Sequence, residues 1–126
     1  MIKKRSIVIS INPAHVDNIL TGVKTFEYRT KAAKHDVGKI IIYETTPIKK
    51  IVAEAEIVAV LTMEPDLLWE ETKDGSGISK EYFDKYFKNR RVAYAYRLGE
   101  IKVYEKPKEL QDFGLKCAPQ SFVYIN

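Results

Sequence analysis

The sequence contains little of what secreted and membrane proteins depend on. Cys117 is its one cysteine, so the chain cannot form the internal disulfides on which small secreted domains rely. The longest apolar runs, residues 40–42 and 57–61, fall far short of the roughly 18 residues that cross a membrane. The basic N-terminus is followed by no apolar segment of signal-peptide type. We therefore expect a cytoplasmic protein that does not bind membranes.

Linkers, repeats and low-complexity stretches are also missing from the 126 residues. Hydrophobic residues make up 45% of the chain and charged residues 30%, which is ordinary for a globular protein and excludes global disorder. A chain of this length can bury one core but not two. We predict a single domain over residues 1–126.

The net charge of +4 points only weakly to an anionic partner, but the charge is unevenly distributed. Residues 1–50 hold ten Lys and Arg against four Asp and Glu, and residues 80–126 hold ten against six. Residues 51–79 reverse the balance, with one basic residue and seven acidic ones. Such segregation can make a positive face on a protein of modest net charge.

Metal ligands at a recognisable spacing are absent from the sequence. His15 and His35 lie in separate segments with no cysteine or carboxylate at ligand spacing. Gly75 and Gly77 lack the strand-to-helix context and the lysine of a phosphate-binding loop. We therefore expect neither a metal nor a cofactor.

Several segments carry the patterns of short strands and helices. Helices are predicted after the N-cap residue Asn12, over residues 65–72, and after the cap Ser79. A tight turn at Gly99–Glu100 is predicted to separate two of the strands, and Pro107 to end the second of them. The predicted strands cover residues 6–11, 23–30, 39–46, 51–61, 91–98, 101–105 and 120–125.

The arrangement of these segments favours an α+β fold. Residues 39–46 are apolar on both faces, which is typical of a central strand. Only a tight turn separates them from residues 51–61, whereas a parallel pair would need a crossover helix. We predict a mixed, largely antiparallel sheet of five or six strands that curls into a small barrel with short flanking helices.

The strand after Gly22 carries the residues of greatest chemical interest. By the period of two, Thr25, Glu27 and Arg29 share one face, and Lys24 at its start can point into the same space. A glutamate accepts hydrogen bonds from an exocyclic amine, and an arginine matches a phosphate or a base edge. An exposed ion pair worth under about 1 kcal/mol would be an equally ordinary use of Glu27 and Arg29.

The motif Gly22-x-Lys24-x-x-Glu27-x-Arg29 resembles the signature of the ASCH domain, a branch of the PUA-like superfamily. The resemblance continues along the chain and is greatest with a prokaryotic and phage subgroup labelled predicted transcriptional regulators. It implies a barrel with a cleft where the motif strand meets the first helix, which binds RNA or a modified nucleotide. The other segments that carry it are residues 10–13, 43–52, 76–79, 82–83 and 119–122.

The resemblance implies that Lys24, Glu27 and Arg29 line this cleft, and Ser10 belongs to the predicted nucleic-acid-binding set. Gln120 and Ser121 have two open interpretations. They either begin the closing strand or reach the cleft beside Lys24 with their polar groups.

Two other functions remain open at this stage. Some small ASCH proteins resemble amidohydrolases of acylated cytidine, and Lys24, Thr25 and Glu27 would then be the catalytic residues. Because Glu27 occupies the place of a second threonine, the motif favours binding over acyl transfer. The third function is protein interaction, with the aromatic helix of residues 82–87 docking a partner.

Overall fold

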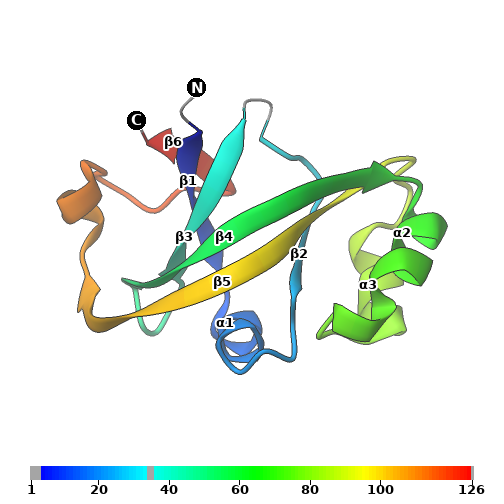
Figure 1. The fold of residues 1–126 in the computed structure, drawn as a ribbon, viewed down its shortest axis with the longest axis horizontal. Helices are drawn as coiled ribbons and strands as arrows, with labels where there is room; N and C mark the ends of the chain where they lie inside the picture. Colours follow the sequence, from blue (N-terminus) through cyan, green and yellow to red (C-terminus); the bar gives the residue numbers. More distant parts are fainter. Residues whose placement is uncertain (1–3, 34–35, 126) are drawn as a thin grey trace.

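The computed structural model describes residues 4–33 and 36–125, which form a curled six-stranded sheet with short helices (Figure 1). The helices are α1 (Pro13–Leu20), α2 (Pro65–Thr72) and α3 (Lys80–Tyr86), with 3-10 turns η1 (Lys73–Gly75) and η2 (Leu110–Phe113). The strands are β1 (Arg5–Ile11), β2 (Phe26–Arg29), β3 (Val37–Glu44), β4 (Lys50–Met63), β5 (Ala93–Lys108) and β6 (Phe122–Ile125). In these residues no helix is long and apolar enough to cross a membrane.

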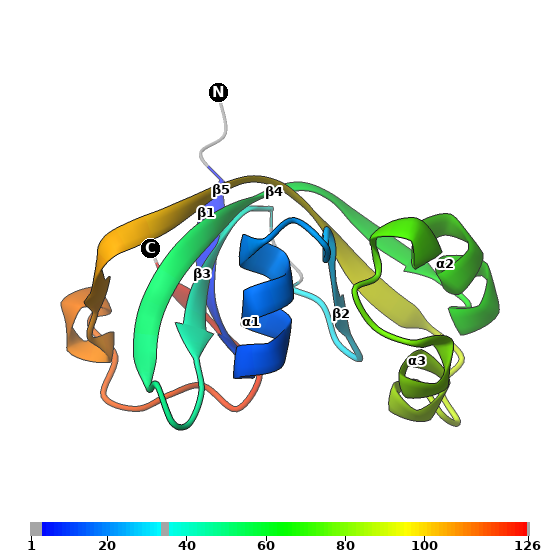
Figure 2. The same ribbon diagram turned by 90° about the horizontal axis from the view of Figure 1, so that it is seen from below.

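The strand order is β2-β5-β4-β3-β1-β6, and of these neighbours β1 and β3 are parallel while the other pairs are antiparallel. The sheet curls into a half-barrel with α1 on its concave side (Figure 2). The predicted mixed α+β architecture is therefore confirmed, including the central place of β3.

The ends of α1 and α3 form as the sequence predicts. The Asn12 side chain accepts a hydrogen bond from the His15 backbone N–H, and Ser79 caps α3 in the same way through Tyr82. Gly22 has a φ of 83°, the left-handed conformation that ends a helix at low cost for glycine. These caps fix where each helix starts, and so which of its side chains reach the space between them.

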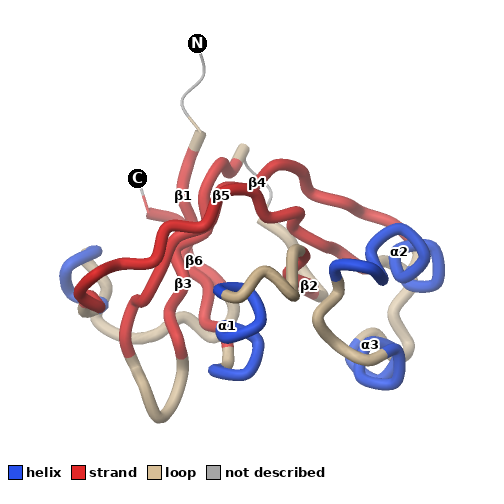
Figure 3. The backbone as a smooth tube through the Cα atoms, turned by 60° about the horizontal axis from the view of Figure 1, so that its bottom comes forward, coloured by secondary structure: helices blue, strands red, loops and turns tan. Residues whose placement is uncertain are grey.

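Two of the apolar clusters lie beneath α1 and α3. Val16 and Ile19 of α1 pack on the concave face of β1, β3 and β4. Phe83 of α3 and Phe87 at its C-cap pack instead on Tyr28 and other residues at the far end of β4 and β5. Figure 3 shows the result, with α1 and α3 on opposite sides of β2.

The predicted break in the fifth strand is wrong. Residues 93–108 form one strand, β5, which runs through Gly99–Glu100 and Pro107 and pairs with β4 along most of its length. Three register shifts take up the local irregularity. A Cβ on Gly99 would lie 2.3 Å from the Glu56 carboxylate, so this glycine permits close strand contact instead of a turn.

The alternation over residues 6–11, with Ile7, Ile9 and Ile11 on one face, predicts a strand with a single buried face, and the structure differs from this. Ile7, Ile9 and Ile11 face the concave core as expected. Val8 on the opposite face is fully buried as well, against Ile41 and the C-terminal segments. The C-terminal residues that cover this face lie over a hundred positions later in the chain, so the local sequence pattern of β1 does not predict its burial.

Candidate functional site

The motif strand β2 places two opposite charges on one buried face. Glu27 is 3% exposed, and its Oε2 lies 2.9 Å from Nη2 of Arg29 and accepts a hydrogen bond from Nε at 3.1 Å. The alternating residues Phe26 and Tyr28 enter the core beneath α3. The pair therefore joins a buried Glu27 to a partly buried Arg29 and is not an exposed surface ion pair.

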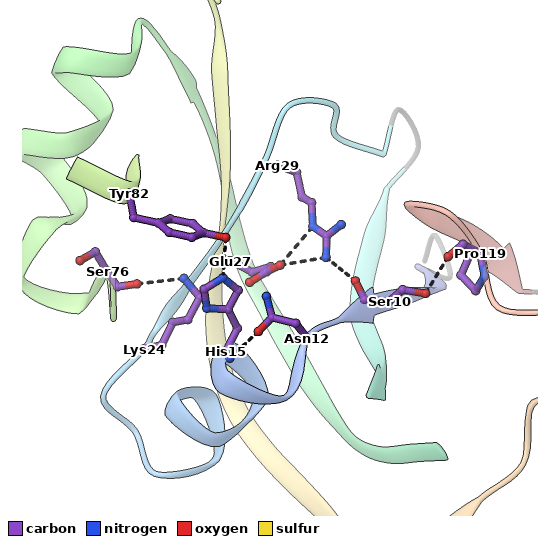
Figure 4. A network of polar contacts seen from close by, with 9 residues as sticks. All are labelled: Ser10, Asn12, His15, Lys24, Glu27, Arg29, Ser76, Tyr82 and Pro119. Carbon is purple, nitrogen blue, oxygen red and sulfur yellow. Dashed lines mark hydrogen bonds and ion pairs between the residues drawn. The ribbon is translucent and has the colours of Figure 1, made fainter. Parts of the chain in front are cut away.

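Arg29 also joins β2 to β1, which are not neighbours in the sheet. Its Nη2 donates to the backbone carbonyl of Ser10 at 2.8 Å. The Ser10 hydroxyl donates in turn to the carbonyl of Pro119 at 2.6 Å, and the Ser10 N–H donates to Ser121 O. These bonds hold together the open side of the half-barrel (Figure 4).

Lys24 precedes β2 and is 2% exposed. Its Nζ donates to the backbone carbonyl of Ser76 at 2.9 Å and lies 4.8 Å from the centre of the Tyr28 ring. The loop that supplies this carbonyl packs closely on the lysine. Gly77 has a φ of 66°, and a Cβ there would lie 2.4 Å from that of Lys24, so the contact requires glycine.

Aromatic side chains from both helices surround the space above these charges. Nε2 of His15 on α1 lies 3.2 Å from the Tyr82 hydroxyl on α3, and the two rings meet edge to face (Figure 4). Tyr86 lies one turn after Tyr82, and burial raises the pKa of its hydroxyl while the nearby backbone of Thr30 lowers it. Tyr82 is 46% and Tyr86 37% exposed, so the rim is open to solvent while the floor is buried.

Together these groups enclose a cavity of about 160 Å³. This is roughly half of the smallest clefts that hold drug-sized ligands, so it suits one small planar group. The lining residues are Ser10, Ile11, Asn12, His15, Lys24, Glu27, Tyr28, Arg29, Ile78, Tyr82 and Tyr86.

Burial, together with the neighbouring charges, shifts the pKa values of two lining groups. Burial lowers the pKa of the Lys24 ammonium; Glu27 opposes that shift and Arg29 adds to it. Burial also lowers the pKa of His15, and Lys24 and Arg29 reinforce the effect against the opposing Glu27. His15 is therefore mainly neutral at pH 7, and its ring can accept a proton.

The structure brings together four of the predicted binding residues, Ser10, Lys24, Glu27 and Arg29. Three other predicted residues do not line the cavity. The hydroxyl of Thr25 donates to Gly75 O at 3.4 Å; Ser121 contacts the wall through its backbone, and the exposed Gln120 precedes it. A role for Gln120 and Ser121 in binding stays a prediction.

Sequence reasoning missed the contribution of the helices to this site. It treated His15 as an isolated histidine and residues 82–87 as one aromatic face. The helical spacing separates these aromatics, since Phe83 and Phe87 are buried while Tyr82 and Tyr86 line the cavity. The i, i+4 spacing of the two tyrosines is the signal that could have shown it.

No group of three or more His, Cys, Asp or Glu side chains is placed to hold a metal ion among residues 4–33 and 36–125. His15 belongs to the cavity. The other histidine considered above, His35, lies outside the described residues.

The sequence is similar to parts of several longer curated proteins. It is 28% identical to ATP synthase subunit alpha of Ureaplasma parvum over 98% of the chain and 16% of that protein. It is 25% identical to large ribosomal subunit protein uL22 of the same organism, over 95% of the chain and 39% of that protein. The chain thus spans well under half the length of these two relatives.

A third relative is more similar in size. The ASCH domain-containing ribonuclease of Zymomonas mobilis is 27% identical over 75% of this chain and 65% of that protein. The crystal structure of ASCH from Zymomonas mobilis superposes with a TM-score of 0.88 at 24% identity, covering 98% of this chain and 90% of that one. This likeness shows that the two share a fold.

The family comparison agrees with the fold and with the motif. The model of the ASCH domain matches residues 9–109, a range that includes the end of β1, the Lys24–Arg29 motif and both cavity helices. The chain belongs to the ASCH domain family.

Proposed function

We propose that this protein binds RNA, with one base of the strand entering the cavity between α1 and α3. The observation that carries the proposal is the floor of the cavity, where the Lys24 ammonium and the Glu27 carboxylate lie buried beneath an exposed aromatic rim. Nucleic-acid bases present flat apolar faces with hydrogen-bonding edges, and this cavity offers partners for both.

The floor favours a base edge that carries an amine next to an acceptor. The Lys24 ammonium has three N–H groups, of which one donates to Ser76 O. The Glu27 carboxylate is an acceptor, as an exocyclic amine requires. Cytosine and adenine combine such an amine with a ring acceptor, whereas uracil has no amine. We expect amine-bearing bases, modified or not, to bind more tightly than uracil.

The rim supplies a face for stacking. Tyr82 is nearly half exposed and is held by His15 at right angles to its own ring. Stacking of a base on an aromatic side chain is worth about 1–3 kcal/mol. A base on Tyr82 would bring its edge toward Lys24 and Glu27, which line the same cavity.

Two relatives have names that concern RNA. One is named a ribonuclease and another a protein of the large ribosomal subunit. The match to an ATP synthase subunit covers 16% of that protein and supports no activity here. The resemblance to predicted transcriptional regulators stays a prediction.

Binding is tested by fluorescence anisotropy with labelled single-stranded oligoribonucleotides of cytosine, adenine or uracil at 50–200 mM salt. We expect affinity to fall as salt rises, and uracil to bind most weakly. Lys24→Met and Tyr82→Ala should each weaken binding by about tenfold or more, corresponding to 1.4 kcal/mol. Lys106→Met, at the other end of β5, is the control for charge. Salt-independent affinity that neither cavity variant changes would exclude this function.

A second candidate is RNA cleavage at the same cavity, which His15 favours. As the 2′ oxygen bonds to phosphorus, its proton would pass to the neutral His15 ring and the bond from phosphorus to the 5′ oxygen would break. The leaving 5′ oxygen would take a proton from the Lys24 ammonium, whose lowered pKa makes it a better donor. The products would be a 2′,3′-cyclic phosphate and a free 5′ hydroxyl.

Cleavage is tested with the same oligonucleotides in EDTA. His15→Ala should slow cleavage by about 100-fold or more while RNA binding persists, and a DNA oligonucleotide should remain intact because it has no 2′ hydroxyl. Equal cleavage by the wild type and by His15→Ala prepared identically would identify a contaminating nuclease and exclude this candidate.

The other two functions have less support. An acyl transfer needs a hydroxyl beside Lys24, but that of Thr25 lies at the Gly75 carbonyl, outside the cavity. Docking of a protein on residues 82–87 needs a free aromatic face. Phe83 and Phe87 are buried there, which leaves Tyr82 and Tyr86 as the exposed aromatic residues of that segment.

A further inference from the structure

Charges of opposite sign lie on different sides of the cavity mouth. On the side of α3 and the end of β2, Lys85 and Lys31 are exposed. On the side of α1 and β3, Asp17 and Glu44 are close enough for Asp17 to raise the pKa of Glu44, after the larger effect of burial. Glu44 pairs with the lining residue Ile11, so this negative pair borders the cavity.

Contacts through Tyr86 bring the two lysines to one edge of the mouth. Lys85 directly precedes Tyr86 and lies three residues after Tyr82, so it borders the helical face that lines the cavity. The Tyr86 side chain reaches the backbone of Thr30, the neighbour of Lys31. Lys31, just after the end of β2, and Lys85, on α3, are therefore sequence neighbours of the two residues, Thr30 and Tyr86, that lie next to each other here.

Within residues 4–33 and 36–125, these lysines also differ from others nearby in forming no ion pair with an acidic side chain. Lys80 is paired with Asp84 on α3, and Lys73 with Glu70 beyond the end of α2. Neither Lys31 nor Lys85 takes part in an ion pair within the described part of the chain, although Glu81 lies one turn before Lys85. Two exposed, uncompensated ammonium groups beside a cavity form a surface suited to an anion.

We propose that Lys31 and Lys85 contact the phosphates that flank the base held in the cavity, so that the RNA strand crosses the mouth along the α3 and β2 edge. The inference rests on the proposed RNA binding and adds the path of the strand. It also sets the class of ligand, because a free nucleoside has no phosphates to use this edge. Repulsion by Asp17 and Glu44 disfavours a path over α1.

The test uses the double variant Lys31→Gln/Lys85→Gln and the control Lys102→Gln/Lys106→Gln, which removes the same charge from the opposite end of β5. Each lost phosphate contact on a single strand lowers the slope of log affinity against log salt by about 0.7. We expect the slope to fall by about 1.4 in the first variant and to stay unchanged in the control. Binding of free cytidine, followed by NMR, should be equal in all three proteins.

The outcomes separate this inference from the function on which it rests. A slope that the first variant leaves unchanged, in a protein whose RNA binding still needs Lys24, would overturn the phosphate path alone. Equal losses in the two double variants would overturn it as well, because the effect would then be one of net charge. A wild type that binds no RNA would overturn both.

Discussion

The buried charges on the floor of the cavity differ in what they are bonded to. Arg29 uses Nε and Nη2 on Glu27 and on the Ser10 carbonyl, so two of its three nitrogens are bonded within the protein. Lys24 donates one hydrogen bond, to Ser76. At the scale of single residues, Arg29 therefore holds the cavity together while Lys24 has donors left for a ligand.

Arg29→Met should unfold more easily than the wild type. The change leaves Glu27 buried without its closest counter-charge and removes the bond between β2 and β1. Breaking one side of a buried ion pair typically costs 3–5 kcal/mol, and we expect about 3 kcal/mol by urea denaturation because Lys24 still offsets part of the charge. Adding Glu27→Gln should restore part of this loss; if the double variant is no more stable than Arg29→Met, the ion pair is not the cause.

Lys24→Met should weaken RNA binding but change stability little. Removing the ammonium relieves the cost of burying a charge, and the loss of the bond to Ser76 O costs about 1 kcal/mol. We expect the free energy of unfolding to change by less than about 1 kcal/mol while RNA binding weakens as described above. A loss of stability as large as that of Arg29→Met would mean that Lys24 is mainly structural.

The sequence predicts half of this site for a clear reason. Glu27 and Arg29 are two residues apart, so the period of a strand puts them on one face, and Lys24 lies close to them in the sequence, just before β2. His15 and Tyr82 are 67 residues apart and meet because α1 and α3 pack on either side of β2. No local pattern carries that contact, and each residue on its own is an ordinary helix surface residue.

The loop between α2 and α3 is the element that completes the floor. Its residues Gly75 and Ser76 accept hydrogen bonds from Thr25 N and Lys24 Nζ. A Cβ on Gly75 would lie 2.1 Å from the Thr25 hydroxyl, which is closer than the 2.4 Å approach at Gly77. The composition of this loop indicates a turn, but its contact with residues 24 and 25 follows from the packing of the helices.

Gly77→Ala should therefore disturb both stability and binding. The new methyl group would meet the Lys24 side chain in a left-handed backbone conformation, at a cost of about 1–3 kcal/mol, and it would push the Ser76 carbonyl from Lys24. Gly114→Ala is the matched control, with a φ of 77° and nothing within 4 Å of the new Cβ. It should lose about 1 kcal/mol and bind RNA normally. Equal RNA binding by the two variants would show that the loop does not set the position of Lys24.

The same contrast between local pattern and distant pairing explains β5. Gly99–Glu100 and Pro107 are strong local signals for a turn and a strand end. The facing strand β4 is nearly as long, however, and its pairing extends from Met63 to Ile51. Long-range hydrogen bonding therefore overrides the turn signal, as it often does for β-structure.

For the whole molecule, the class of fold was predictable because it depends on the number and order of elements. The caps mark where the helices begin. The central strand β3 and its short connection to β4 indicate a mixed, mainly antiparallel sheet. The cavity was not predictable in the same way. It lies between the core beneath α1 and the core beneath α3. The distance between these two cores depends on the course of the long strands β4 and β5, and no pattern in the sequence predicts it.

A cavity between two cores should make global stability depend on pH through His15. Its pKa in the folded protein lies below the ordinary value of 6.5, so around and below pH 6.5 the unfolded chain binds more protons. Stability is then complete above pH 6.5 and falls as the pH drops toward the folded pKa, by at most about 1.4 kcal/mol per pH unit. The physical cause is that a protonated His15 must be buried beside Lys24 and Arg29.

Urea denaturation of the wild type and of His15→Gln between pH 5 and 8 measures the contribution of His15 to the free energy of unfolding. Glu44 has a raised pKa and acts in the opposite direction near the acid end, but it is present in both proteins and cancels in the difference. We expect the wild type to lose stability relative to His15→Gln as the pH falls below 6.5. Parallel curves would mean that His15 feels the same environment folded and unfolded, which is incompatible with its place over the buried Lys24 and Arg29.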